Sequence, residues 1–449
     1  TLGWGTQPAT AAAVDVTYNP ILVPGWVAYV QQGGLYVRPT AGKPLTIRAP
    51  GQAGSLSSPA LTAVGDSVFT TWIEKGAGGN RLFLASMQND TGRAGVQTKE
   101  LASGIKSTLV RTFTSERGEL YLFDAALGKA PALHLTVSRD GAQTFQRTQL
   151  DTGGLDVIDH VSPVLLDQHL HVLFLGTKDE RRFIGALAYT LPDMQAAAPV
   201  QIAETQGTFF LKAFAADGRP GAIYKTMEDG KFALHVAVGD QGRWRSAPIK
   251  AAAGLDVAGT DEYAWGDGRV LIVFSGEQKG LFKQQIYAAL SEDGGATWKV
   301  DRIDGKQFGN TRSWLPRLAV SGERVGVVWE DSRQIRAGTR IKLSLDRGGT
   351  WLANAVALSD PKHYVLRPRI SARNDDIYVA WHQYRTDERK AADAVLKQLA
   401  WDDLIEQAKQ AETAIGLEQK KASLLASLKQ YWDGMVAGDL RISYDLHDP

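Results

Sequence analysis

The chain has 449 residues, of which 44% are hydrophobic and 22% charged, so it can bury a large core. Its 50 lysines and arginines nearly cancel its 49 acidic residues, which excludes a global field that favours nucleic acid or an anionic membrane. The sequence has no cysteine, which excludes disulfides and thiolate metal sites. No apolar run reaches the roughly 20 residues that would span a bilayer.

Short apolar strands that end in a bulky residue recur along the chain. Two examples are Val68 to Trp72 and Val325 to Trp329. The gaps between such end residues are mostly 50 to 55 residues, and the first gap is 43. These end residues, which we call anchors, are Tyr29, Trp72, Phe123, Phe174, Tyr224, Phe274, Trp329 and Trp381.

Three octapeptides add a second, independent marker. Ser291 to Trp298 and Ser344 to Trp351 follow the pattern Ser-x-Asp-x-Gly-x-Thr-Trp, and Ser138 to Phe145 has Ala for Gly and Phe for Trp. Each follows an apolar run and precedes another strand-like stretch, which is typical of a hairpin turn. The Asp carboxylate and the Ser and Thr hydroxyls can accept and donate hydrogen bonds within such a turn.

Together the markers divide the chain into units of four short strands, which is typical of propeller blades. The octapeptides resemble the Asp-box, or bacterial neuraminidase repeat, of the sialidase superfamily. We therefore predict an all-β, sialidase-like β-propeller of seven or eight four-stranded blades over residues 15–402. A seven-bladed ring would close one blade with strands from both termini, and a six-bladed ring would need two false anchors.

A different period follows from about residue 402. Apolar residues recur there every three or four positions among Lys, Glu and Gln, which predicts a C-terminal α-helical segment over residues 403–449. The segment either packs against the propeller or mediates association, and its end could begin a truncated second domain. The chain starts at Thr1 rather than Met, and with the family resemblance this favours a periplasmic or secreted protein.

Three arginines lie twelve residues before an anchor, near the expected start of an innermost strand: Arg111, Arg317 and Arg369. If they converge on the ring axis, they form a clamp for a carboxylate or sulfate, because guanidinium is permanently charged and bidentate. Sialidases hold a substrate carboxylate with an arginine triad, so the resemblance implies the same use. The alternative is that each arginine forms a salt bridge with a neighbouring blade.

Further candidates belong to the same face. Trp314 could stack on a sugar, and Glu330 and His382 follow anchor tryptophans. Asp124 and Asp331 are weak candidates for a catalytic proton donor. The nearest string to the Phe/Tyr-Arg-Ile-Pro motif of sialidases, Ile47 to Pro50, lacks the aromatic residue and is out of phase.

We therefore predict a binding or scaffolding propeller whose partner is a glycan or a protein. The alternatives are a sialidase-like hydrolase of an acidic sugar and an assembly subunit that docks through residues 403–449. We expect no cofactor, no metal, no nucleic acid partner and no membrane span.

Overall fold

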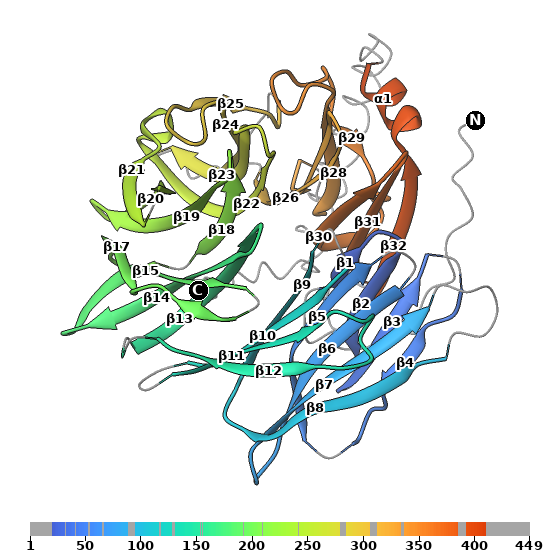
Figure 1. Cartoon of the computed structure of the whole chain (residues 1–449). Coiled ribbons are helices and arrows are strands. Elements are labelled where there is room, and N and C mark those ends of the chain that lie inside the picture. Colours follow the sequence, from blue (N-terminus) through green and yellow to red (C-terminus); the bar gives the residue numbers. More distant parts are fainter. Residues whose placement is uncertain are drawn as a thin grey trace, which may run out of the picture.

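The computed structural model describes residues 20–409, apart from residues 32, 41, 53, 65–66, 89–94, 116–117, 128–130, 153, 155, 192, 209, 241, 279–283, 306–311, 334–335 and 385–391. The strands form eight antiparallel sheets, which we number blades 1 to 8 in chain order (Figure 1). Each sheet is built from consecutive strands, so the chain completes one blade before it begins the next. The predicted all-β propeller is confirmed, and the number of blades is eight.

The first four blades occupy the N-terminal half of the described chain. Their strands are β1 (Ile21–Val23), β2 (Trp26–Gln31), β3 (Gly34–Pro39) and β4 (Leu45–Arg48) in blade 1; β5 (Ser55–Val64), β6 (Ser67–Lys75), β7 (Asn80–Gln88) and β8 (Gln97–Ile105) in blade 2; β9 (Leu109–Thr114), β10 (Leu120–Ala126), β11 (Ala132–Ser138) and β12 (Gln146–Leu150) in blade 3; and β13 (Asp156–Leu166), β14 (His169–Lys178), β15 (Arg181–Thr190), β16 (Gln195–Ala196) and β17 (Val200–Glu204) in blade 4.

The remaining blades follow in the same order. Their strands are β18 (Leu211–Ala216), β19 (Arg219–Glu228), β20 (Lys231–Asp240) and β21 (Arg243–Pro248) in blade 5; β22 (Leu255–Ala264), β23 (Val270–Gln278), β24 (Gln284–Ser291) and β25 (Lys299–Arg302) in blade 6; β26 (Ser313–Ser321), β27 (Arg324–Asp331), β28 (Gly338–Ser344) and β29 (Val356–Ala357) in blade 7; and β30 (Tyr364–Arg373), β31 (Asp376–Tyr384) and β32 (Ala392–Ala400) in blade 8. A short 3-10 helix, Lys250–Ala252, precedes β22.

The first strands of the blades surround the axis of the ring, and most of them contact the first strands of both neighbouring blades. β1 contacts β5 on one side and β30 on the other, so blade 8 follows blade 1 around the ring. Val27 of blade 1 is buried in one cluster with Tyr378 and Leu396 of blade 8. No described sheet combines strands from both ends of the chain, so the seven-bladed alternative with a shared blade does not apply to the described residues.

The core lies between blades because each second strand is buried on both faces. In β27, Val325, Val327 and Trp329 pack toward blade 6, whereas Val328 packs toward blade 8. Trp329 is fully buried. Burying a side chain of this size stabilises the fold by roughly 1.5–3 kcal/mol, which explains the recurring aromatic anchors.

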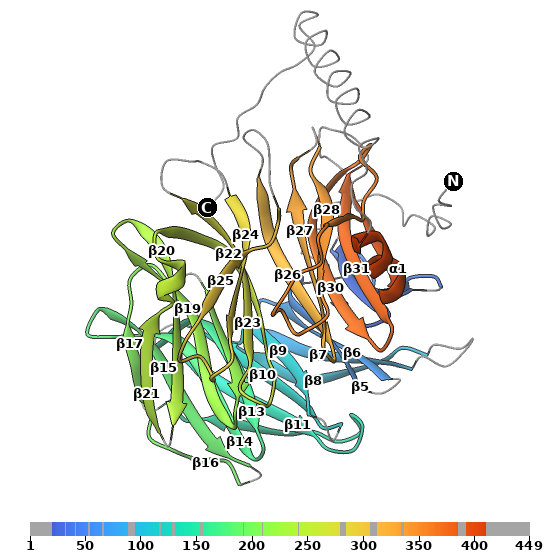
Figure 2. The same cartoon turned by 90° about the horizontal axis from the view of Figure 1, so that it is seen from above.

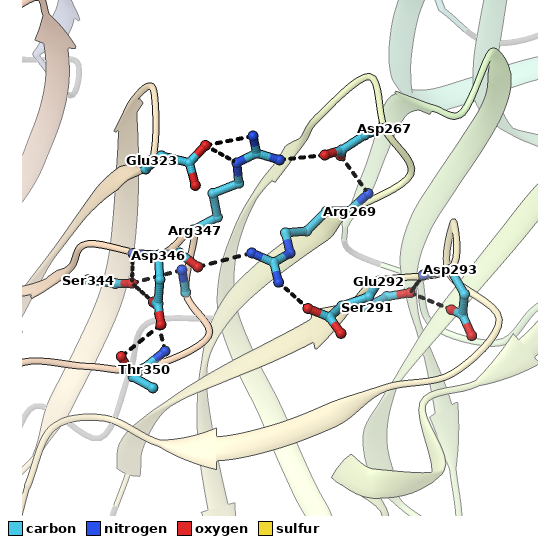
Figure 3. Close-up of polar contacts among 11 residues, drawn as sticks. Asp267, Arg269, Ser291, Glu292, Asp293, Glu323, Ser344, Asp346, Arg347 and Thr350 are labelled. Carbon is cyan, nitrogen blue, oxygen red and sulfur yellow. Dashed lines mark hydrogen bonds and ion pairs between the residues drawn. The ribbon is translucent and has the colours of Figure 1, made fainter.

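The three octapeptides form the same turn between the third and fourth strands of blades 3, 6 and 7. In blade 7, Asp346 accepts hydrogen bonds from the backbone N–H of Thr350 at 2.8 Å and from its hydroxyl at 2.8 Å. The hydroxyl of Ser344 also donates to Asp346, at 2.8 Å. Asp140 and Asp293 accept the equivalent bonds in blades 3 and 6. Figure 3 shows two of these turns side by side, with arginines between them.

These turns also join neighbouring blades. Arg347 of the blade 7 turn forms ion pairs with Glu323 of its own blade and with Asp267 of blade 6 (Figure 3). Arg269 of blade 6 donates from Nη1 to the carbonyl of Asp346 at 3.0 Å. Charged surface pairs contribute little singly, but several that share partners hold two turns in one arrangement.

The helix α1 (Trp401–Lys409) packs against blades 7 and 8, beside β28, β29 and β32 (Figure 2). Trp401, Leu404, Ile405 and Ala408 are buried in the cluster that these two blades share. The apolar face of α1 is therefore covered by the propeller. The rest of the predicted segment, residues 410–449, lies outside the described residues. None of the described helices is long and apolar enough to cross a membrane.

Candidate ligand-binding face

One residue from each blade occupies the same layer of the first strands. Arg111 pairs with Phe123, Arg317 with Val328 and Arg369 with Ala380. Each of these second-strand partners packs toward the next blade in the ring. The layer consists of Ile21, Ala60, Arg111, Ser162, Lys212, Asp261, Arg317 and Arg369. The three arginines thus hold equivalent positions, as their spacing indicates, while their role in binding a ligand stays a prediction.

The layer is charged on one side of the ring, over blades 5 to 8. Lys212 Nζ lies 3.5 Å from Asp261 Oδ1, and the other oxygen of Asp261 accepts the backbone N–H of Leu318 at 3.0 Å. Arg317 donates from Nη1 to the carbonyl of Thr260 at 2.9 Å. Arg369 of the next blade raises the positive charge further. Arg111 is exposed on blade 3, which is opposite blade 7 in a ring of eight, so it does not lie beside the other two arginines.

Glu262 adds a buried carboxyl group beside this layer. Its side chain is only 9% exposed, and Oε1 lies 3.1 Å from Lys212 Nζ. Burial raises the pKa of Glu262 to about 7, although Lys212 acts in the opposite direction. The same carboxylate raises the pKa of Lys212. Lys212 is therefore held as a cation at neutral pH.

Two strained backbone positions lie near the start of β26 and β30, a region that we call the entrance. Leu315 and Arg367 have positive φ values of 50° and 58°, and each directly precedes a proline. Each lies in a break of the strand register, in β26 and in β30. A left-handed, non-glycine residue before proline is costly and persists only where the surrounding structure imposes it. After each kink the strand pairing resumes at Arg317 or at Arg369, so the kinks determine the positions of these two arginines.

Glu330 lies in this region, beside Arg367 and Trp314. Its Oε1 accepts the backbone N–H of Arg367 at 2.5 Å, and Trp314 is its partner across the ladder. Burial raises the pKa of Glu330, and the positive charges of Arg312, Arg367 and Arg369 oppose that rise. Because all three guanidinium groups affect the pKa of this one carboxyl group, all three lie near it.

Arg312 and Trp314 stack on one another in the same region. The Arg312 guanidinium lies over the Trp314 ring, and its Nε donates to Gln284 of blade 6 at 3.0 Å. Burial lowers the pKa of Arg312 to about 10, and burial followed by the charge of Arg317 lowers that of Arg369 to about 10. Both groups remain charged at neutral pH. Within the described chain, Arg312, Arg317, Arg367 and Arg369 form no ion pair within 4.0 Å.

His382 is buried beneath the same entrance and is 1% exposed. It follows Trp381 and pairs across the ladder with Leu366. Burial, then the charges of Arg367 and Arg369, lowers its pKa to about 4. The imidazole is therefore neutral at pH 7, and its predicted contact with a ligand stays a prediction.

The two catalytic candidates have structural partners. Asp124 is fully buried, accepts the hydroxyl of Ser107 at 2.6 Å and pairs with Arg147 at 2.7 Å. Asp331 is 4% exposed and accepts the indole N–H of Trp329 at 2.9 Å and the backbone N–H of Arg333 at 3.0 Å. Both carboxylates are engaged in buried bonds, so neither is placed to donate a proton to a ligand on the axis.

Asp124 also corrects one detail of the strand phase. In the other blades the anchor packs toward the preceding blade, as Trp329 does toward blade 6. In blade 3, Phe123 packs toward blade 4 instead. Asp124 holds the anchor position, and its pairing with Arg147 replaces the apolar contact.

Sequence reasoning missed Lys212, Asp261 and Glu262. Lys212 could have been found, because it lies twelve residues before the anchor Tyr224. Asp261 lies thirteen residues before Phe274, so the same rule points to Glu262 instead. The described residues contain no group of three His, Asp or Glu side chains that could hold a metal ion.

Comparisons with known proteins bear on the fold. No protein-family model matches the chain, and no curated protein matches its sequence. Solved structures that do match include the polysaccharide lyase Uly1, with 10% identity, a TM-score of 0.48, and coverage of 87% of this chain and 99% of that one. The β-propeller domain of the Trilobed protease from Pyrococcus furiosus has 12% identity, a TM-score of 0.45, and coverage of 78% and 99%.

The NanB sialidase from Streptococcus pneumoniae also matches, with 11% identity, a TM-score of 0.39, and coverage of 84% of this chain and 90% of that one. At these identities and scores the likeness concerns the β-propeller architecture alone.

Proposed function

We propose that this protein is an extracytoplasmic binding module that holds an acidic glycan over blades 5 to 8. The observation that carries the proposal is the gathering of Arg312, Arg317, Arg367 and Arg369 at one entrance without an ion-paired carboxylate among the described residues. Guanidinium groups bind carboxylates and sulfates through two parallel hydrogen bonds. A desolvated guanidinium such as that of Arg369 gains most from such an anion.

Trp314 supports a sugar rather than a simple anion. An indole presents a flat apolar surface with a polar edge, which suits the mixed faces of a pyranose ring. Lys212 deeper in the layer offers a further cation, with its side chain 44% exposed. An acidic oligosaccharide could place one charged group near Arg369 and a neighbouring ring on Trp314.

The test is calorimetric titration with oligogalacturonate, with a heparin-derived hexasaccharide and with uncharged cellohexaose. We expect the acidic oligosaccharides to bind and the neutral one not to bind. Arg369→Gln should weaken binding roughly tenfold or more, the scale of one charge-assisted bidentate contact. Arg243→Gln, an exposed arginine on β21, is the matched control and should leave the affinity unchanged. Equal affinities for Arg369→Gln and the native protein would refute the proposed site.

A hydrolase or lyase is the second candidate, and Glu330 is the observation that favours it. Burial raises the pKa of Glu330, which favours the protonated acid that a proton donor needs, and three arginines lie beside it. The release of reducing ends or of unsaturated products from the same acidic oligosaccharides would establish turnover. Turnover that disappears in Glu330→Gln would replace the binding role with catalysis.

A further inference from the structure

A residue at the start of the second strand, or directly before it, joins neighbouring blades in two places. In blades 6 and 7 the next residue, Val270 or Val325, pairs with the serine that opens the octapeptide. The residue before it is Arg269 in blade 6 and Arg324 in blade 7. We call this the bridging position, because both arginines extend to the following blade.

Arg324 shows what the bridge contributes. Its Nη2 donates at 2.9 Å to the carbonyl of Asn374 and at 2.9 Å to the carboxylate of Asp375. Both residues belong to the turn between β30 and β31 of blade 8. Arg269 similarly donates to the carbonyl of Asp346 in blade 7. A guanidinium group thus fills the space between adjacent blades at this end of the ring.

Blade 3 carries the opposite charge at the bridging position. Leu120 pairs with the octapeptide serine Ser138, so Glu119 is the equivalent of Arg324. Glu119 accepts bonds from Ser115 Oγ at 3.2 Å, from Tyr121 OH at 2.8 Å and from Arg139 Nε at 3.2 Å. All these donors belong to blade 3, so the carboxylate is held in place without a link to blade 4.

The facing turn of blade 4 matches the turn that Arg324 binds in blade 8. Leu166 and His169 flank it, as Arg373 and Asp376 flank the other. Its residues Asp167 and Gln168 correspond to Asn374 and Asp375, and Asp167 has a φ of 50° where Asn374 has 54°. Among the residues the structure describes in these two turns, none forms a hydrogen bond or ion pair from blade 3 to blade 4.

A cavity of about 520 Å³ occupies this place. Blade 3 contributes Glu119 and Arg139, and blade 4 contributes Asp167 and an apolar wall of Leu165, Leu166 and Leu191. The charges of the described lining residues sum to minus one. The cavity therefore offers carboxylate oxygens of Glu119 and Asp167 at the position where an arginine bridges blades 7 and 8. It also offers an apolar surface that an aliphatic stem could contact.

We propose that this cavity binds a guanidinium or ammonium group on a short aliphatic stem. The cation would lie where Arg324 lies between blades 7 and 8, between the Glu119 carboxylate and the Asp167 turn. Its stem would lie against the leucines of blade 4. The same chemistry is offered by a free diamine or guanidino compound and by the arginine side chain of a partner protein. The site is on the side of the octapeptide turns, at the other end of the first strands from the arginine-lined entrance.

Calorimetric titration of the full chain tests the proposal with agmatine, with N-butylurea as its uncharged counterpart, and with the peptide acetyl-Gly-Arg-Gly-amide. We expect agmatine to bind and N-butylurea not to bind. Glu119→Gln should weaken agmatine binding roughly tenfold, because a charge-assisted hydrogen bond becomes a neutral one. Leu166→Trp should block the cavity by volume while leaving Glu119 in place. Peptide binding would identify a protein side chain as the source, and binding of agmatine alone a free cation.

The matched control is Glu323→Gln, which removes a turn carboxylate of blade 7 that pairs with Arg347 and lies outside the cavity. It should leave the affinity for agmatine unchanged. Thermal unfolding of each variant shows that the propeller is intact. Absence of binding by agmatine and by the peptide, equal binding to Glu119→Gln, or equal binding of N-butylurea would each overturn the proposal.

Discussion

Replacing Glu262 by glutamine should change how the stability of the propeller depends on pH. Glu262 is 9% exposed, and burial raises its pKa from 4.5 to about 7. The folded protein therefore retains a proton between pH 4.5 and 7 that the unfolded chain has released. The contribution of Glu262 to the free energy of unfolding is fully present below pH 4.5 and is lost as the pH rises through 7.

The size of the effect follows from the two pKa values. Each unit of difference is worth about 1.4 kcal/mol, so ionisation of Glu262 lowers the free energy of unfolding by about 3 kcal/mol between pH 4 and pH 8. Glutamine does not titrate, and Lys212 keeps Asp261 as a partner, so the variant lacks the loss of stability caused by ionisation of Glu262. We therefore expect the Glu262→Gln variant to gain about 3 kcal/mol relative to the native protein over this range.

Urea denaturation at pH 4, 6 and 8 measures the effect, with the native protein and the variant side by side. Glu323→Gln is the control, because the Glu323 side chain is 61% exposed and should give curves parallel to the native ones. Parallel pH dependences for the native protein and Glu262→Gln would refute the reasoning. Lys212 would remain near Asp261 in the variant, so loss of its cation is not expected.

Three further changes test other parts of the fold. Asp346→Ala removes the acceptor of the Thr350 amide and hydroxyl and should lower the free energy of unfolding by about 1–3 kcal/mol in urea; an unchanged midpoint would contradict the role of the turn. His382 has a pKa of about 4 in place of 6.5, so the native protein should lose stability as the pH falls through this range, and His382→Gln should lose less between pH 7 and pH 5 in thermal unfolding. Arg48→Met removes one of the two arginines that pair with the buried Glu74, while Arg81 stays at 2.7 Å, and should cost about 1.5–3 kcal/mol in urea; an unchanged midpoint would contradict a stabilising role of the Arg48 pair.

The architecture was predictable because it repeats. Anchors and octapeptides recur at nearly constant spacing, and each reports the same local packing or turn. The equivalence of Arg111, Arg317 and Arg369 came from that spacing too. What the spacing could not decide was blade number, since a three-dimensional contact between β1 and β30, rather than a local pattern, closes the ring.

The candidate site was only partly predictable, because it depends on contacts between blades. Phe123 was predicted to be an anchor because it is large and apolar. The buried carboxylate of Asp124 occupies that position instead, with Ser107 and Arg147 as partners. A sequence pattern assigns a charged residue to the surface unless its partner is known.

The arginine bridges of blades 6 and 7 also bear on the mechanics of the ring. Arg269, Arg324 and Arg347 fasten the turns of blades 6, 7 and 8 into a stiff arc. Between blades 3 and 4 the described residues of the turns that contain Glu119 and Asp167 form no such bond, and the blades are held by apolar packing and by the bond from Tyr189 OH to the carbonyl of Asp151. A closed ring under load separates first at the interface with the fewest stabilising contacts. Heating or pulling should therefore open this propeller between blades 3 and 4, and a cation bound at Glu119 would stabilise that interface.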